Sequence, residues 1–157
     1  MSQLVKPLTL VHPTMDASIE FVWTDDRFDH AIRLGPVKLQ SLCGPPDECW
    51  PDSPPIQQLS IETLEGRPVA LGVGGAGTSH WSLSVEPVES GFRFDWACRA
   101  KSTPERLGTT YASDSHLNFK PGEETVVGFN DGRVDIQPGH SMLSSGSYRW
   151  QYQAVVR

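Results

Sequence analysis

The stretch from Ser79 to Lys101 constrains the fold of this chain more than any other part of the sequence. It contains two runs in which apolar and polar residues alternate, separated by a corner at Glu89-Ser90-Gly91. The apolar positions are Trp81, Leu83 and Val85 in the first run and Phe92, Phe94, Trp96, Cys98 and Ala100 in the second. Successive side chains of a strand point to opposite faces, whereas a helix would not sort these residues by type. The stretch is therefore predicted to be a β-hairpin with an aromatic inner face and a charged outer face.

The same alternation recurs along the chain and predicts an all-β protein. Further hairpins are expected over residues 18–34, 56–73 and 125–136, and a final strand over residues 148–156. The turn Asn130-Asp131-Gly132 supports this, since these residue types accept the positive φ angles of tight hairpins. We predict a single domain over residues 1–157, an antiparallel β-sandwich or flattened β-barrel of about 9–11 short strands. At most one short helical turn is expected, near residues 103–107, with Pro104 at its first position.

A long proline-rich loop is predicted over residues 43–55. Proline fixes φ and lacks an amide donor, so this segment cannot continue a β-ladder. Long loops inside compact domains are often either functional or poorly ordered. Trp50 lies in this loop and belongs to no alternating pattern, which leaves two interpretations open. It is either a contact residue for a partner or a cap that folds back over an open end of the sheets, and we favour the cap.

The glycine-rich segment GVGGAG, residues 72–77, is interpreted as a turn or bulge between strands. A loop that binds a phosphate or a dinucleotide is followed by a helix whose amino terminus faces the phosphates. Here the glycines lead instead into the strand that begins at Ser79. No cofactor is therefore predicted.

Neither a metal site nor a catalytic residue is predicted. Five residues separate Cys43 from Cys49, whereas zinc-binding pairs are usually separated by two to four. The tightest acidic cluster consists of Asp25, Asp26 and Asp29 with His30, and its acidic residues are interpreted as turn residues. The sequence has no G-x-S-x-G motif that would present a serine nucleophile at a strand–turn–helix elbow.

Composition excludes several functional classes. The chain has 157 residues and a formal net charge of −6, and it has no basic stripe of the kind that binds nucleic acid. No apolar run approaches the roughly 20 residues needed to span a bilayer, and no signal peptide is recognisable. The odd number of cysteines, three, indicates a reducing compartment. We therefore expect a cytoplasmic protein that binds neither nucleic acid nor membrane.

The expected function is that of a soluble, non-catalytic binding or interaction domain with an unidentified protein or small-molecule partner. Self-association through a sheet edge is a further expectation. The candidate contact residues are Trp50 in the loop and His80, Glu86, Arg93, Asp95 and Arg99 on the charged face of the 79–101 hairpin. The alternative is a small-molecule-binding β-barrel, or an enzyme built on one, whose polar cavity the same hairpin would line. We favour a solvent-facing polar side, because antiparallel sheets commonly bury one face and leave the other in water.

Overall fold

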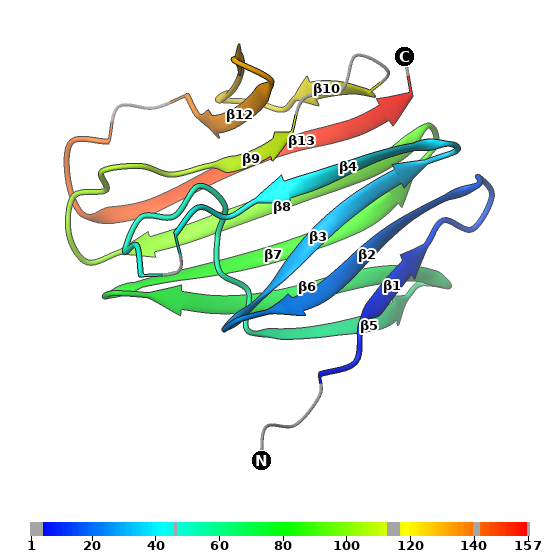
Figure 1. Ribbon diagram of the computed structural model, residues 1–157, viewed down its shortest axis with the longest axis horizontal. Helices are drawn as coiled ribbons and strands as arrows, with labels where there is room; N and C mark the ends of the chain where they lie inside the picture. Colours follow the sequence, from blue (N-terminus) through cyan, green and yellow to red (C-terminus); the bar gives the residue numbers. More distant parts are fainter. Residues whose placement is uncertain (1–4, 46, 113–116, 140–141, 157) are drawn as a thin grey trace.

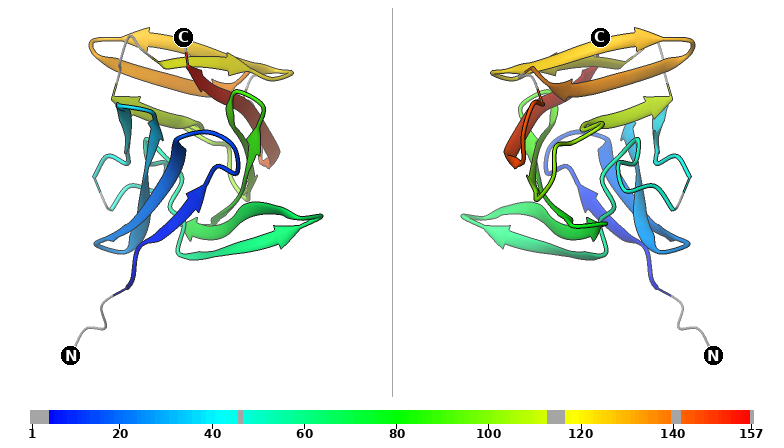
Figure 2. Two further views of the ribbon diagram at one scale, coloured as in Figure 1. Left: turned by 90° about the vertical axis from the view of Figure 1, so that its right-hand side faces the viewer. Right: turned by 90° about the vertical axis from the view of Figure 1, so that its left-hand side faces the viewer.

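Thirteen strands form the regular secondary structure of the computed structural model, which describes residues 5–45, 47–112, 117–139 and 142–156. The strands make two antiparallel sheets that stack face to face (Figures 1 and 2). The sheets do not close into a barrel, so the predicted all-β class is confirmed in its sandwich form. The described part of the chain contains no helix, and hence none long and apolar enough to cross a membrane.

The first sheet has seven strands and places the start of the chain at one edge. In spatial order they are β1 (Leu8–Val11), β2 (Ala17–Thr24), β3 (Arg27–Leu34), β4 (Val37–Leu42), β9 (Thr109–Ala112), β12 (Arg133–Pro138) and β11 (Thr125–Asn130). The edge position of β1 agrees with the effect expected of Pro7, which cannot donate to a ladder. The sequence did not predict β9, because its first three residues are all buried and show no alternation.

The second sheet has six strands, and the predicted 79–101 hairpin lies at its centre. In spatial order the strands are β10 (Leu117–Pro121), β13 (Gly146–Val156), β8 (Gly91–Ala100), β7 (Ser79–Val88), β6 (Arg67–Ala76) and β5 (Gln58–Leu64). The total of thirteen strands exceeds the nine to eleven predicted. Residues 103–107 form an irregular connection with a bend at Glu105, and the helical turn that the sequence allowed there is not formed.

Aromatic side chains from β8 and β13 form the centre of the core. Trp96 stacks on Trp150 with 6.2 Å between ring centroids, and Phe94 stacks on Tyr152 at 5.0 Å. All four side chains are buried. Large aromatic groups bury the most surface per residue, so this cluster fixes β8 and its neighbours firmly against the opposite sheet.

A chain of hydrogen bonds crosses the interior and joins the two sheets. The indole N–H of Trp96 donates to the hydroxyl of Tyr152 at 3.0 Å, and this hydroxyl lies 2.6 Å from that of Tyr111 in β9. The Tyr111 hydroxyl lies in turn 2.6 Å from Nε2 of His30 in β3. The Tyr152 hydroxyl accepts the indole N–H and can accept a second hydrogen bond, so the tautomer of His30 decides which group donates in the two contacts beyond it. Burial lowers the pKa of His30 to about 3, which agrees with a neutral imidazole.

The proline-rich loop after β4 is held against the seven-stranded sheet by polar contacts. The hydroxyl of Ser53 donates to the carbonyl of Leu42 at 2.7 Å and accepts the backbone N–H of Thr110 at 3.0 Å. The carboxylate of Asp52 forms ion pairs with Arg106 and Arg133 at 3.4 Å and 3.1 Å. These contacts fill the gap between β4 and β9, whose shared ladder is two residue pairs long. The part of the loop at Asp52 and Ser53 is therefore fixed to the sandwich.

The interpretation of residues 72–77 as a turn or bulge is wrong. Three of the four glycines of this segment lie within β6, and Gly77 (φ +59°) lies in the turn that follows. A Cβ atom on Gly74 would lie 1.8 Å from the carbonyl oxygen of Pro55. Glycine is therefore required because the end of the proline-rich loop crosses β6 in direct backbone contact, a cause that local sequence cannot show.

Candidate binding site

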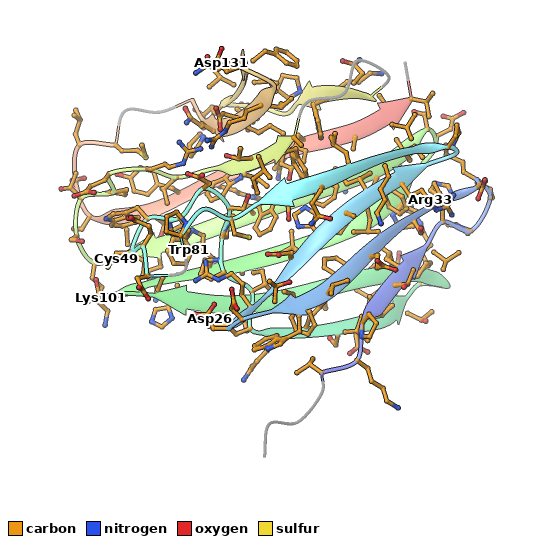
Figure 3. The ribbon with its side chains drawn as sticks, in the orientation of Figure 1. Asp26, Arg33, Cys49, Trp81, Lys101 and Asp131 are labelled. Carbon is orange, nitrogen blue, oxygen red and sulfur yellow. The ribbon has the colours of Figure 1, made fainter. Side chains whose placement is uncertain are left out.

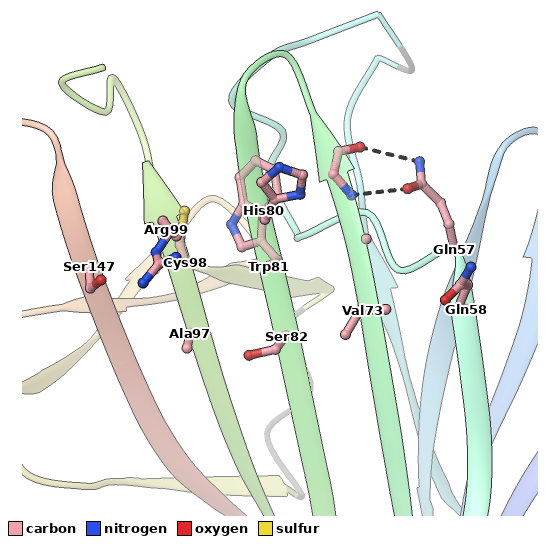
Figure 4. Close-up of a pocket in the computed structure, with 12 residues that line it drawn as sticks. Gln57, Gln58, Val73, His80, Trp81, Ser82, Ala97, Cys98, Arg99 and Ser147 are labelled. Atoms are coloured by element: carbon pink, nitrogen blue, oxygen red, sulfur yellow. Dashed lines mark hydrogen bonds between the residues drawn. The ribbon is translucent and has the colours of Figure 1, made fainter. Parts of the chain in front are cut away.

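The outer face of the six-stranded sheet is hollowed where β5, β6, β7, β8 and β13 lie next to one another (Figure 4). The polar side of the β7–β8 hairpin points outward, and one of its cross-strand pairs consists of Ser82 and Ala97. Val73 of β6 lies opposite Ser82, and Arg149 of β13 lies opposite Ala97. These four residues form a row across β6, β7, β8 and β13. The space above the sheet is unfilled at the middle of the row, because Ser82 and Ala97 have shorter side chains than the residues on both sides of them.

The first hollow has a volume of about 750 Å³. Gly75, Ser82 and Ala97 belong to its lining and fill little of the space above the strands. Val73 and Gln58 line it on the side of β5 and β6. Because these residues project from hydrogen-bonded strands backed by the aromatic core, the shape of the hollow is set by the sheet and not by a loop.

One end of the first hollow is polar and basic. His80 lies opposite Arg99, and Arg99 lies opposite Ser147, so the three form a row across β7, β8 and β13 (Figure 4). At the other side the Gln57 side chain is hydrogen-bonded to the backbone of Gly75. Its amide donates to the Gly75 carbonyl at 3.2 Å and accepts the Gly75 N–H at 3.0 Å. These two bonds hold Gln57 in place as the wall of the hollow.

A second hollow of about 780 Å³ continues the first along the strands, since both are lined by Gln58, Val73, Ser82 and Ala97. We call the two together the outer trough. The second hollow also contains a neutral ion pair, in which Nε of Arg149 donates to Asp95 at 2.8 Å. Gln151 donates to the same carboxylate at 3.1 Å. Arg149 binds both carboxylate oxygens of Asp95, which is a strong charge-assisted contact. The pair leaves no net charge at this end of the trough.

The structure brings three of the six predicted contact residues to the outer trough. His80 and Arg99 line the first hollow, and Asp95 lines the second. Glu86 and Arg93 form an ion pair with each other one row beyond, and neither is among the residues that line the trough. One part of the charged face of the hairpin therefore lines the outer trough, and the other part consists of an ion pair outside it.

Trp50 lies away from the outer trough. Its ring meets Trp81 edge-on, with 6.3 Å between centroids, and it is half-buried against the core. Trp50 and Cys49 also line a separate small cleft beside the turn between β6 and β7, and Figure 3 shows Cys49 at the same end of the molecule as Trp81. This position agrees with the interpretation of Trp50 as a cap.

The alternative of a polar cavity inside a barrel is wrong in its location. The sheets form an open sandwich, and the side chains proposed to line such a cavity, His80, Arg93 and Arg99 among them, are exposed on the outer face. The space between the sheets is filled by apolar and aromatic side chains. A small-molecule site on the 79–101 hairpin is therefore an open trough and not an interior cavity.

The acidic cluster near residue 29 divides between two environments. His30 points into the core, whereas Asp29 accepts a hydrogen bond from the Cys43 thiol at 2.7 Å. Burial, with a further contribution from Asp29, raises the pKa of Cys43 well above its usual range, so this thiol is a poor nucleophile. Among the described residues no group of three or more His, Cys, Asp and Glu side chains could hold a metal ion.

The sequence did not identify the residues that complete the trough, namely Gln58, Val73, Ser147 and Arg149. They belong to β5, β6 and β13, and β13 becomes a neighbour of the hairpin only through pairing of distant residues such as Val155 with Gly91. The alternation within each strand shows which residues face outward, but only the strand order shows which of them share a row.

No protein-family model, no curated protein and no solved structure matches this chain.

Proposed function

We propose that this chain is a non-catalytic binding domain whose ligand lies in the outer trough. The observation that carries the proposal is the row of short side chains, Ser82 and Ala97, between the longer Val73 and Arg149 on four adjacent strands. A solvated antiparallel face usually carries longer side chains that cover its backbone. Short ones grouped at the centre leave a preformed concave surface on a rigid base.

The dimensions of the trough support a small-molecule ligand. Each hollow, at about 750 Å³ and 780 Å³, lies within the range of roughly 300–1,000 Å³ typical of ligand sites. The lining combines apolar surface at Val73 with hydroxyl, amide and charged groups at Ser82, Gln58 and Arg99. Such a mixture provides both contact area and directional recognition. The three free thiols support a cytoplasmic location for this binding domain.

A fragment screen followed by ¹H–¹⁵N correlation spectra tests the proposal. We expect the fragments that bind to shift the amides of β6, β7, β8 and β13 around Ala97. Ala97→Trp, which fills the trough, should abolish these shifts, whereas Glu20→Trp, at an exposed position on β2 of the other sheet, should preserve them. Fragments that bind only elsewhere, or shifts that survive in Ala97→Trp, would contradict the assignment of the site.

A further inference from the structure

We infer that the ligand of the outer trough is a small organic acid, with its carboxylate at Arg99 and an apolar body extending over Val73 and Ala97. This inference rests on the proposed function and adds the chemical class of the ligand. It depends on the charge of the first hollow, the availability of Arg99 and the position of the apolar surface.

The first hollow carries positive charge in a protein that is acidic as a whole. Among the described residues that line it there is no carboxylate, and Arg99 contributes the formal charge. The whole chain, by contrast, has a formal net charge of −6. A local positive site surrounded by net negative charge attracts an anion and excludes cations of the same size.

Arg99 differs from Arg93 and Arg149, its arginine neighbours on β8 and β13, by its lack of a carboxylate partner. Arg93 is paired with Glu86, and Arg149 is paired with Asp95. Within the described part of the chain, Arg99 forms no ion pair and no hydrogen bond. A guanidinium binds a carboxylate through two parallel hydrogen bonds. His80 and Ser147, its neighbours in the row, add further donors at the same end.

The apolar part of the trough lies on the side opposite Arg99. Val73 and Leu71 on β6 are 47% and 38% exposed, although both are aliphatic. Gln58, directly opposite Val73 on β5, adds one amide to this side of the trough. Val73 lies two strands away from Ala97, across Ser82, and Arg99 lies two residues from Ala97 along β8. These separations place the Cα atoms of Arg99 and Val73 about 12 Å apart. A carboxylate with an aryl or alkyl tail of about this length spans both ends.

Two probes of the same shape and different charge test the inference on the full chain. They are 4-phenylbutanoate and its uncharged amide, 4-phenylbutanamide, each titrated while the amide signals of Ser82 and Ala97 are followed. We expect the acid to bind at least fivefold more tightly than the amide. In Arg99→Gln the preference should fall below twofold. Arg93→Gln, on the same strand and the same face, removes an equal charge outside the trough and should keep the preference.

The outcomes separate the inference from the proposed function. Equal binding of acid and amide in the trough, or a preference that persists in Arg99→Gln, would overturn the organic-acid inference while leaving the trough as a binding site. Binding of neither probe, together with no hits at the trough in the fragment screen, would overturn both. Arg99 is exposed, so Arg99→Gln should fold normally, and the dispersion of its correlation spectrum verifies this in the same sample.

Discussion

Replacing His30 with phenylalanine should remove a large part of the pH dependence of the stability of this protein. Burial lowers the pKa of His30 from an ordinary value of 6.5 to about 3 in the folded state. Below pH 6.5 the unfolded chain therefore takes up a proton that the folded chain excludes, and the free energy of unfolding falls until the pH approaches 3. Each pH unit in this window corresponds to about 1.4 kcal/mol, so His30 alone should lower the stability by about 2 kcal/mol between pH 7 and pH 5.

The difference in unfolding free energy between wild type and His30→Phe at neutral pH follows from the interior hydrogen-bond chain. In His30→Phe the buried Tyr111 hydroxyl loses its hydrogen-bond partner at 2.6 Å, and leaving a buried polar group without that partner costs about 1–3 kcal/mol. Wild type should therefore be more stable than the variant by about 2 kcal/mol at pH 7. Because only wild type loses the contribution of His30 in acid, the two proteins should have similar stability near pH 5.

Urea unfolding followed by tryptophan fluorescence at pH 7, 6 and 5 measures this convergence. His80→Gln is the matched control, since His80 is exposed on the outer face, and its difference from wild type should stay small throughout. If the gap between wild type and His30→Phe were equal at pH 7 and pH 5, His30 would be protonated alike in the folded and unfolded states. That result would refute the argument that the core encloses a neutral imidazole at the end of the hydrogen-bond chain.

Two further substitutions test the packing around the proline-rich loop by thermal and urea unfolding. Gly74→Ala should destabilise the protein by about 3 kcal/mol, because its Cβ would overlap the Pro55 carbonyl oxygen, whereas Gly128→Ala, with its nearest neighbouring atom 3.9 Å away, should change stability by less than about 0.5 kcal/mol. Equal effects of the two changes would show that the loop does not contact β6 closely. Trp50→Ala should cost about 2 kcal/mol, roughly half the effect expected for a fully buried tryptophan, through loss of its contact with Trp81. It should leave binding of 4-phenylbutanoate unchanged, and weaker binding without loss of stability would instead identify Trp50 as a contact residue.

The local architecture was predictable from the sequence, because alternation acts between neighbouring residues. The hairpin predicted over residues 79–101 matches β7 and β8 with their aromatic face inward, and the turn at Asp131-Gly132 has the positive φ angles expected of it. What the sequence could not provide was the order of strands that are distant in the chain. The pairing of β13 with β8, which brings Ser147 and Arg149 beside the hairpin, depends on the tertiary fold.

The candidate site shows the same division. His80, Asp95 and Arg99 were identifiable as outward-facing polar residues of one hairpin, whereas the unfilled space beside them depends on which residues of β5, β6 and β13 share their rows. The glycines of β6 were misread for a related reason. Gly74 admits the backbone at Pro55, which reaches β6 only through the path of the proline-rich loop.

The position of β13 has a consequence for the synthesis of the protein. This strand follows every other strand of its sheet in the chain and is synthesised after them, yet it lies inside the six-stranded sheet, where it pairs with β8 along Gly146–Val155 and with β10 on its other side. Until it emerges, the nascent chain exposes two unpaired strand edges, and Trp96 lacks the stacking partner Trp150. Cotranslational folding of this sheet therefore waits for β13. A ribosome that stalls before Gly146 would expose an aggregation-prone intermediate, which chaperones bind, rather than a folded domain.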